Sequence, residues 1–311
     1  MKKNCLLCFL LFFSCHSALA GESLDSLLNV LDKTIKEADT YVQIKENKLH
    51  ELKKEARKTP PVSVERYHLN NDIYLEYKAY SSDSALHYLN ENMLLARQLN
   101  DKERELKIQL ELSYLLSSIG MYMEAADILN SIDRQTLPSS LLGHYYTCYE
   151  HVYFEAGAAQ PRYKMFASRY VKLSHAYRDS MQITLDPSSA TYLWLRETQL
   201  REAGKYDEAL EFSDRRLAES SFGTPQYALV AYQRFRLFES MGKKDEHLYY
   251  LVLSAISDVR SAIKEQSSLM VLAQELNSKG DLKRAYDYIN FSWEISQFYK
   301  TRLRSWMNIT P

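Results

Sequence analysis

A pattern of two helices joined by a tight turn recurs along this chain, and it constrains the fold more than any other feature. The clearest copy, residues 190–218, reads as two amphipathic helices that meet at Gly204. Glycine adopts the left-handed backbone that ends a helix without a steric cost. Ala209 is small enough for the two helices to cross closely. Because one such hairpin cannot bury its own apolar face, the pattern predicts neighbouring hairpins that cover it.

Further copies of the turn supply these neighbours. Gly120 and Gly280 open close copies, residues 242–247 keep the glycine, and residues 80–85 keep the alanine. The six pivot positions recur every 38 to 42 residues and are Ala85, Ala125, Ala167, Ala209, His247 and Ala285. This spacing predicts an all-α, right-handed superhelix of about six helical hairpins. The crossing should be wider where His247 replaces the alanine.

These turns resemble those of tetratricopeptide repeats over roughly residues 62–299, although ~34 residues is the usual length of such a repeat. More narrowly, the chain resembles the N-terminal sensor part of a family of bacterial membrane-bound regulators. In that family an export signal and a helical-repeat domain precede a single membrane helix, a coiled coil and a cytoplasmic output segment. No hydrophobic stretch of membrane-spanning length follows the repeats up to Pro311, so the resemblance covers the sensor part alone.

The sequence divides into three expected segments: a signal peptide at 1–20, an N-terminal amphipathic helix at 21–58 and a tetratricopeptide-like repeat domain at 62–311. The signal peptide begins with Lys2 and Lys3, continues with a short apolar core, and ends in a small-residue cleavage site before Gly21. Its apolar run is too short for a permanent membrane helix. Cleavage predicts a periplasmic or otherwise exported chain. Lipid attachment at Cys15, which would tie the chain to a membrane, is the less favoured alternative.

Charge and cysteine content bear on the partner and on the source of stability. Removing Lys2 and Lys3 from the 39 basic residues leaves 37, against 40 acidic ones, and a net charge of −3. This near-neutral balance argues against a nucleic-acid surface, which needs concentrated positive charge. Cys148 is the one cysteine after the predicted signal peptide, so the expected fold relies on its apolar core and not on an intramolecular disulfide.

The two ends of the predicted repeat array have distinctive sequences. Residues 22–58 keep a helical spacing of leucines, which favours a helix that caps the first repeat; a dimerising coiled coil is the alternative. The C-terminal helix is unusually apolar for a terminal cap. Its exposed aromatic residues predict self-association or continuation into a following segment, and they are Trp293, Phe298, Tyr299 and Trp306.

No motif for catalysis, cofactor binding or metal binding stands out. The chain has no phosphate-binding glycine loop, no zinc-type cysteine pairing and no His-Glu-x-x-His sequence, so we expect no enzyme activity, no cofactor and no metal. His144 and His151 lie seven residues apart with Glu155 one turn further, where a structural or surface role is favoured over a metal site. The tyrosines of residues 139–156 indicate either an irregular repeat that bends the array or an aromatic wall of a binding groove.

The remaining functional candidate is the surface of the array. The resemblance to tetratricopeptide repeats implies that the first helix of each hairpin lines a concave face, and counting back from each turn gives the residues that would point into it. Packing between adjacent first helices is the competing role for each of them. The candidates for ligand or partner binding are Lys107, Tyr114, Trp194, Thr198, Arg201, Tyr232, Arg236, Glu239, Gln274 and Asn277.

These candidates predict an exported, non-enzymatic recognition domain that binds a peptide or protein partner on its concave face and is the sensor part of a regulator. The alternative is a periplasmic small-solute sensor, in which a saccharide or similar solute stacks on aromatic residues. The shape of the site separates the two. A long open groove favours a peptide, whereas a closed pocket of a few hundred Å³ favours a solute.

Overall fold

The computed structural model describes residues 23–159, 163–264 and 267–299 of the chain. Within those ranges the secondary structure consists of fourteen helices and no strands, which confirms the predicted all-α class. None of these helices is long and apolar enough to cross a membrane. The predicted signal peptide, Cys15 and Trp306 lie outside the described residues.

Two N-terminal helices precede six helical hairpins, the number predicted from the turns. The N-terminal pair is α1 (Leu24–Lys36) and α2 (Ala38–Ala56). The hairpins are α3 (Val64–Tyr77) with α4 (Ser82–Gln98), α5 (Lys102–Ser118) with α6 (Tyr122–Ser131), α7 (Ser139–Ala158) with α8 (Lys164–Thr184), α9 (Ala190–Glu202) with α10 (Tyr206–Ala218), α11 (Pro225–Ser240) with α12 (Lys244–Arg260), and α13 (Ser268–Ser278) with α14 (Leu282–Tyr299).

The predicted glycine turn has the expected backbone. Gly204, in the turn between α9 and α10, has a φ of +73°. No atom lies within 4 Å of the place where its Cβ would stand. The left-handed backbone, and not crowding, therefore requires glycine there. The alanines that follow the turns, among them Ala125 and Ala209, are fully buried where the two helices of a hairpin cross.

The third hairpin departs from this pattern. Its helices α7 and α8 are 20 and 21 residues long, and the predicted pivot Ala167 is only half-buried. The close approach comes instead from Gly157, where a Cβ would lie 3.4 Å from the Cβ of Tyr170. A methyl group at position 157 would be in van der Waals contact with α8, so the two backbones lie close together there.

Threonine or aspartate directly before proline is typical of a helix start, which predicts N-caps at Thr224 and Asp186. The structure treats the two differently. Thr224 caps α11 by accepting a hydrogen bond from the amide of Tyr227, with Pro225 in the first turn, as expected. The start expected at Asp186 lies three residues later, because Ser189 caps α9 and accepts a bond from the amide of Tyr192. The carboxylate of Asp186 instead accepts hydrogen bonds from the amide and the hydroxyl of Ser188, in the turn before α9.

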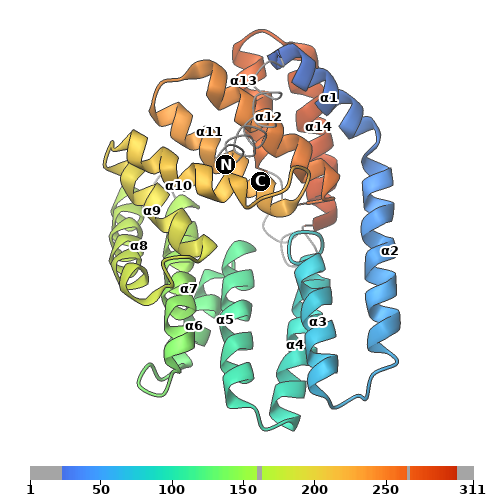
Figure 1. Cartoon of the computed structure of the whole chain (residues 1–311), viewed down its shortest axis with the longest axis vertical. Helices are drawn as coiled ribbons and strands as arrows, with labels where there is room; N and C mark the ends of the chain where they lie inside the picture. The colour runs from blue at the N-terminus through green and yellow to red at the C-terminus, as the bar shows by residue number, and fades with distance from the viewer. Residues whose placement is uncertain (1–22, 160–162, 265–266, 300–311) are drawn as a thin grey trace, which may run out of the picture.

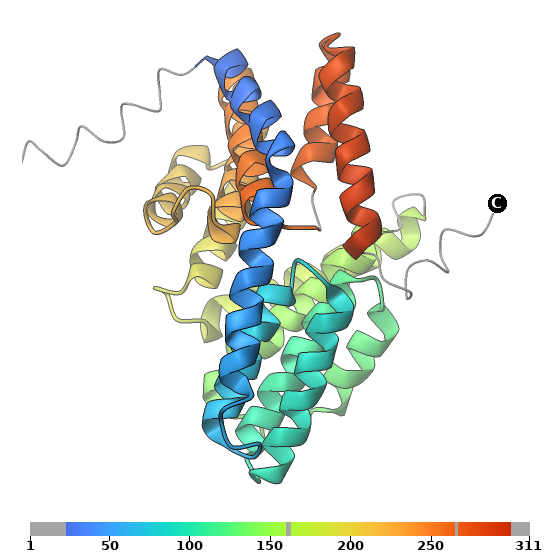
Figure 2. The ribbon, with the colours of Figure 1, turned by 90° about the vertical axis from the view of Figure 1, so that its right-hand side faces the viewer.

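The N-terminal segment breaks at Glu37 and reaches both ends of the array. Leu27, Leu28 and Leu31 of α1 belong to a core shared with α11, α12, α13 and α14. Leu49 and Ala56 of α2 belong instead to the core of the first hairpin, α3 and α4. Figure 2 shows the two helices running along the length of the molecule. The segment thus connects the first hairpin to the last two, and does not cover the first repeat alone.

The array also closes on itself at the loops. The amide of Lys264, between α12 and α13, donates a hydrogen bond of 2.9 Å to the carbonyl of Ala79, between α3 and α4. Ala262, in the same α12–α13 loop, is buried in the core of the first hairpin. Figure 1 shows the hairpins following a closed path, with α13 and α14 returning toward α1. The superhelix is therefore a ring, and its inner face encloses space.

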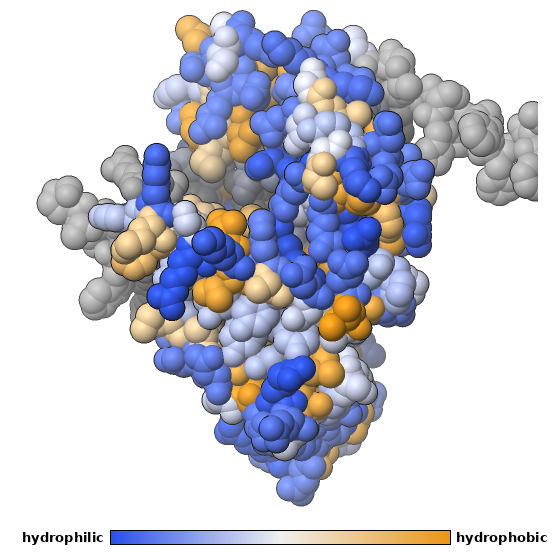
Figure 3. Space-filling view, turned by 90° about the vertical axis from the view of Figure 1, so that its left-hand side faces the viewer, coloured by the Kyte–Doolittle hydropathy of each residue, from blue (hydrophilic) through white to orange (hydrophobic). Residues whose placement is uncertain are grey.

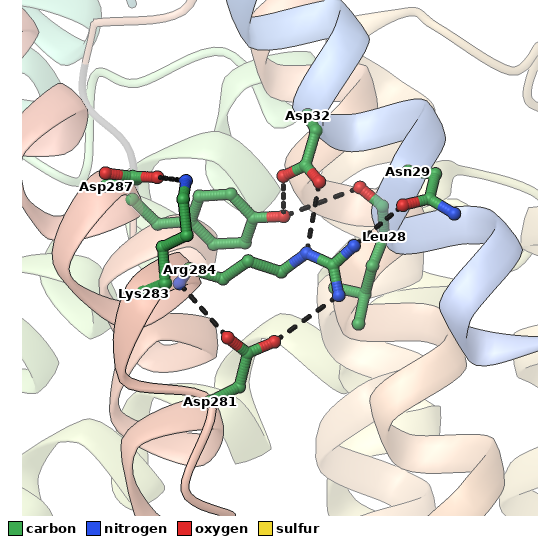
Figure 4. Close-up of polar contacts among 8 residues, drawn as sticks. Leu28, Asn29, Asp32, Asp281, Lys283, Arg284 and Asp287 are labelled. Atoms are coloured by element: carbon green, nitrogen blue, oxygen red, sulfur yellow. Dashed lines mark hydrogen bonds and ion pairs between the residues drawn. The ribbon is translucent and has the colours of Figure 1, made fainter.

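Polar contacts between α1 and α14 complete the closure (Figure 4). Arg284 on α14 contacts Asp32 and Asn29 on α1, with N–O distances of 3.0 and 2.7 Å. The buried hydroxyl of Tyr288 donates to the other carboxylate oxygen of Asp32 at 2.7 Å. The carboxylate of Asp32 therefore accepts hydrogen bonds from two side chains of α14.

Candidate functional site

A cavity of about 790 Å³ lies on the inner face of the ring, between α7, α8, α9, α11 and the α12–α13 corner. Ala79 and Ile263, from the two loops that meet at the closure, also line it. The cavity is thus bounded by hairpins that are distant in sequence, and the closure of the ring supplies part of its wall.

The α9 wall follows the helical period. Trp194, Thr198 and Arg201 lie four and three residues apart, so they share the face of α9 that lines the cavity. Thr198 is 7% exposed, while Trp194 and Arg201 are half-buried. An indole, a hydroxyl and a guanidinium therefore follow one another along one side of the site.

The α11 wall is arranged in the same way. Leu229, Tyr232 and Arg236 lie three and four residues apart and all line the cavity. Leu229 is 56% exposed and Phe154 on α7 is 49% exposed. Water therefore reaches apolar groups in the cavity wall. An aromatic residue and an arginine on α11 thus match the aromatic residue and the arginine on α9.

Ion pairs engage two of the acidic residues that line the cavity, Glu197 and Glu202. The guanidinium of Arg178 donates to Glu150 at 2.8 Å and to Glu202 at 2.9 Å. Glu197 accepts a bond of 2.5 Å from Arg216, and both of these side chains are nearly inaccessible. These charges are neutralised inside the protein, so they define the walls of the cavity.

Arg201 has no such partner. Its side chain forms no hydrogen bond or ion pair with any residue in the described part of the chain. Burial, and then the positive charge of Arg236, lower the pKa of Arg201. Arg236 itself contacts Glu239 at 3.3 Å, and both of these side chains are half exposed. Two neighbouring guanidinium groups therefore face the cavity, and the acidic residues that act on Arg201, Glu197 and Glu202, are already paired with other arginines.

The opposite wall contains a buried carboxyl. Asp258 on α12 accepts a hydrogen bond from the hydroxyl of Ser268 on α13. Burial raises the pKa of Asp258 to about 7, and the hydrogen bond from Ser268 offsets this only in part. At neutral pH this group is close to the midpoint of its titration.

Five of the ten predicted site residues come together in the cavity: Trp194, Thr198, Arg201, Tyr232 and Arg236. Glu239 does not line it and pairs with Arg236 instead. Lys107 lies exposed on α5, and Gln274 and Asn277 lie exposed on α13. Tyr114 is stacked face to face on His151 with ring centres 3.9 Å apart. The structure therefore supports one cluster and does not join all ten positions in a continuous groove.

Counting along the first helices missed the remaining walls. Phe154 comes from the C-terminal part of α7, whereas Asp258 and Ser254 come from α12, a second helix. One signal for Asp258 was present in the sequence, because it is the one charged residue in the stretch 248–259. Nothing local indicated that this helix faces α9.

Tyrosines of the third hairpin serve packing. Tyr149 stacks on Tyr177 with ring centres 4.6 Å apart and an angle of 4°, which joins α7 to α8. Tyr145 and Tyr146 are less than 9% exposed. These side chains do not line the cavity, so the irregular-repeat interpretation describes them better than an aromatic wall of a groove.

His144 and His151 have separate partners. His144 lies 3.6 Å from Glu111, and His151 shares a hydrogen bond of 3.0 Å with Ser118. Burial, and then the charge of Lys78, lower the pKa of His151 to about 3. Among the residues described, no three His, Cys, Asp or Glu side chains gather in a way that could hold a metal. Both histidines have structural surroundings.

The side of the molecule on which α8 lies in Figure 1 offers no continuous apolar track. Figure 3 shows that hydrophilic residues cover most of this face and that hydrophobic ones form separate patches. Exposed apolar residues of α8, such as Met165 and Ile183, are 18 positions apart in sequence. Single exposed apolar residues are ordinary on protein surfaces, so the cavity is the more specific candidate site.

The ring of glycine-turn hairpins and its inner cavity define a tetratricopeptide-type (TPR) helical-repeat domain, a class that is generally non-catalytic and generally mediates interactions. The family model described as the SusR N-terminal TPR domain matches residues 35–309, and the chain belongs to this family. This agrees with the resemblance to the sensor part of bacterial regulators. No curated protein is similar enough to the chain to count as a relative.

Proposed function

We propose that this chain is an exported recognition domain of the SusR type that binds a small solute of saccharide type in the inner cavity. The observation that carries the proposal is the cavity itself. Its volume of about 790 Å³ falls in the ~300–1,000 Å³ range of small-molecule sites. Such sites combine aromatic walls with a few placed polar groups, as Trp194, Tyr232 and Thr198 do here.

The geometry favours this solute alternative over a peptide or protein partner on an open groove. An extended peptide needs a continuous track along several hairpins, and the candidates on α5 and α13 do not line the same cavity as those on α9 and α11. The contact of Lys264 with Ala79 closes the ring. The half-buried rings of Trp194 and Tyr232 suit the apolar faces of sugar rings.

The site of action in this proposal is the periplasm. Residues 1–20 carry the features of a cleaved signal peptide, and attachment of a lipid at Cys15 is the less favoured route. Ligand capture by α9, α11 and α12 would reach the rest of the protein through the α1–α14 contacts that close the ring. A ligand stabilises the ring when it binds the closed form more tightly than an opened one.

Calorimetry and thermal-shift measurements on the chain from Gly21 test the proposal. The panel contains neutral and acidic oligosaccharides together with peptides of matched length. We expect at least one saccharide to raise the melting temperature, and Trp194→Ala to remove this rise. Tyr114→Phe, a change of a first-helix aromatic residue outside the cavity, is the matched control. A shift produced by peptides alone, or one that survives Trp194→Ala, would contradict the proposal.

A further inference from the structure

We propose that the cavity selects an acidic solute, a uronate-type saccharide, whose carboxylate is bound by Arg201 and Arg236. This inference rests on the proposed small-solute function and adds the chemical class of the ligand. Guanidinium groups bind carboxylates through two parallel hydrogen bonds, which gives orientation as well as affinity.

The first argument is the charge balance of the cavity walls. Three charged side chains of the lining, Arg178, Glu197 and Glu202, are engaged in ion pairs of 2.5 to 2.9 Å. Arg201 lacks an ion pair with any described residue. The contact of Arg236 with Glu239 is a half-exposed pair three residues apart on one helix, which contributes little. The positive charge of the two arginines is therefore available to a ligand.

The second argument is that the two arginines repel each other. The charge of Arg236 lowers the pKa of Arg201, second only to burial. A bound anion between the two guanidinium groups would offset both the repulsion and the loss of water around them. An uncharged ligand cannot supply this compensation, so the wall of α9 and α11 favours an anion over a neutral analogue of the same shape.

The third argument is the spacing between aromatic and cationic groups. Arg201 follows Trp194 by seven residues, which corresponds to roughly 10 Å along α9. Arg236 follows Tyr232 by four residues, or roughly 6 Å along α11. A ligand that stacks one ring on the aromatic pair thus reaches the arginines with the next ring. That span suits a saccharide of two or three units with a carboxylate one ring away from the stacked one.

Acidic groups elsewhere in the cavity fit the rest of such a ligand. Glu155 on α7 and Asp258 on α12 also line the cavity, on helices other than those that carry Arg201 and Arg236. Both carboxyl groups can accept hydrogen bonds from hydroxyl groups, and an ionised one repels a second carboxylate. They would therefore direct the hydroxyls of a sugar toward α7 and α12 and its carboxylate toward α9 and α11.

The test uses matched pairs of probes. Each pair is a uronate trisaccharide, such as linear trigalacturonate, and the neutral trisaccharide made from it by reducing the carboxylates to alcohols. Calorimetry on the mature chain should show at least roughly tenfold tighter binding of one acidic member, the effect of one hydrogen-bonded charge. The difference should shrink as salt is raised. Arg201→Gln and Arg236→Gln should remove the preference, because each lowers the affinity for the acidic member more than the affinity for the neutral one.

Two further measurements separate a binding role from a structural one. Arg196→Gln is the matched control, because Arg196 lies on the same helix and bonds Gln199 outside the cavity; it should keep the preference. Without ligand, Arg201→Gln should melt at the same temperature as the parent chain or higher, since it relieves the repulsion with Arg236. A lower melting temperature would assign Arg201 to the fold and would overturn the inference.

The outcomes distinguish the inference from the function on which it rests. If acidic and neutral members bind equally and Trp194→Ala removes both, the inference fails and the proposed function stands. If no saccharide of any pair binds, both fail. Binding of a peptide through its C-terminal carboxylate, sensitive to Arg201→Gln, would also overturn both, because the ligand would then belong to another class.

Discussion

The Nε of Arg284 lies 3.0 Å from the Oδ2 of Asp32, so the last hairpin is bonded to the first helix across 252 positions of sequence. The hydroxyl of Tyr288 approaches the other oxygen of the same carboxylate at 2.7 Å. With Lys264 and Ala79 joined at the opposite corner, this contact makes the array a ring. The inner cavity exists because hairpins distant in sequence are held around a common space.

Removing the aspartate should weaken the ring. In Asp32→Ala the buried hydroxyl of Tyr288 and the guanidinium of Arg284 each lose one acceptor, and we expect a loss of about 1–3 kcal/mol in the free energy of unfolding. Urea denaturation measures it. Asp287→Ala breaks the exposed pair with Lys283 on the same helix and should cost less than about 0.5 kcal/mol. Equal effects of the two changes would mean that the closure adds nothing to stability.

The titration of Asp258 should make stability depend on pH. Burial raises its pKa from 3.8 to about 7, so the folded state holds a proton there that the unfolded chain releases. Stability from this group is therefore fully present at low pH and is lost as pH rises toward and through 7. Asp258→Asn removes the loss and should stabilise the protein at pH 8, by at most about 4 kcal/mol, with little effect at pH 4.

Denaturation at both pH values checks this sign. The other titrating groups cancel when the difference between variant and parent is compared at the two pH values. Asp245→Asn, at the exposed start of the same helix α12, is the control and should give no pH-dependent difference. A benefit of Asp258→Asn that is equal at pH 4 and pH 8 would show that the carboxyl does not titrate in this range.

The histidine at the fifth pivot should be nearly neutral for stability. The Nε2 of His247 is buried without a hydrogen bond and lies 3.9 Å from a carboxylate oxygen of Glu275, while the ring meets the edge of Phe235. His247→Ala loses this ring contact and also removes a buried unpaired nitrogen. The two effects oppose each other, so we expect a change within about 1 kcal/mol by urea denaturation.

The reverse substitution tests the same packing. Ala285→His places a histidine at the equivalent pivot of the last hairpin, where the alanine is 7% exposed. We expect a loss of about 1–3 kcal/mol from overpacking. If His247→Ala costs several kcal/mol while Ala285→His costs nothing, the imidazole at position 247 makes a necessary bond and the pivots do not require a small residue.

How far the sequence predicts the molecule depends on the range of each interaction. The turn at Gly204 and the cap at Thr224 are decided within a few residues, and both agree with the structure. The face shared by Trp194 and Arg201 is also local, because the helical period sets it. The packing partners of Leu28 are not local. The leucine spacing of α1 predicts a buried stripe, but nothing in residues 24–36 indicates that this stripe packs against α12 and α14.

The cavity shows the same division. The walls on α9 and α11 follow from first-helix periodicity, and the prediction placed five residues there. Asp258 and Ile263 reach the cavity only because the ring closes through the contact of Lys264 with Ala79. Closure is a property of the accumulated angles between six hairpins, and no single repeat contains it. The volume of the cavity and the closure of the ring around it therefore came from the structure.

The apolar face of α14 should mediate association with a second copy of the chain. Leu282, Tyr286, Ile289 and Trp293 are 64%, 67%, 39% and 59% exposed, and they follow one another by four, three and four residues. This spacing forms one stripe along a helix and matches the seam of a coiled coil, which pairs with a like helix. The predicted aromatic residues Phe298 and Tyr299 end the same helix, although their side chains lie outside the described set.

Sedimentation velocity over a range of concentrations tests the association. The mature chain should form dimers, and the double change Tyr286→Ser with Trp293→Ser should shift it toward the monomer without lowering the melting temperature. Met165→Ser with Ile183→Ser removes two residues of α8 that are 75% and 84% exposed, and it should leave the dimer intact because they form no stripe. Monomers in all three proteins would show that the α14 face does not join two copies. Dissociation by the α8 change alone would place the interface on α8.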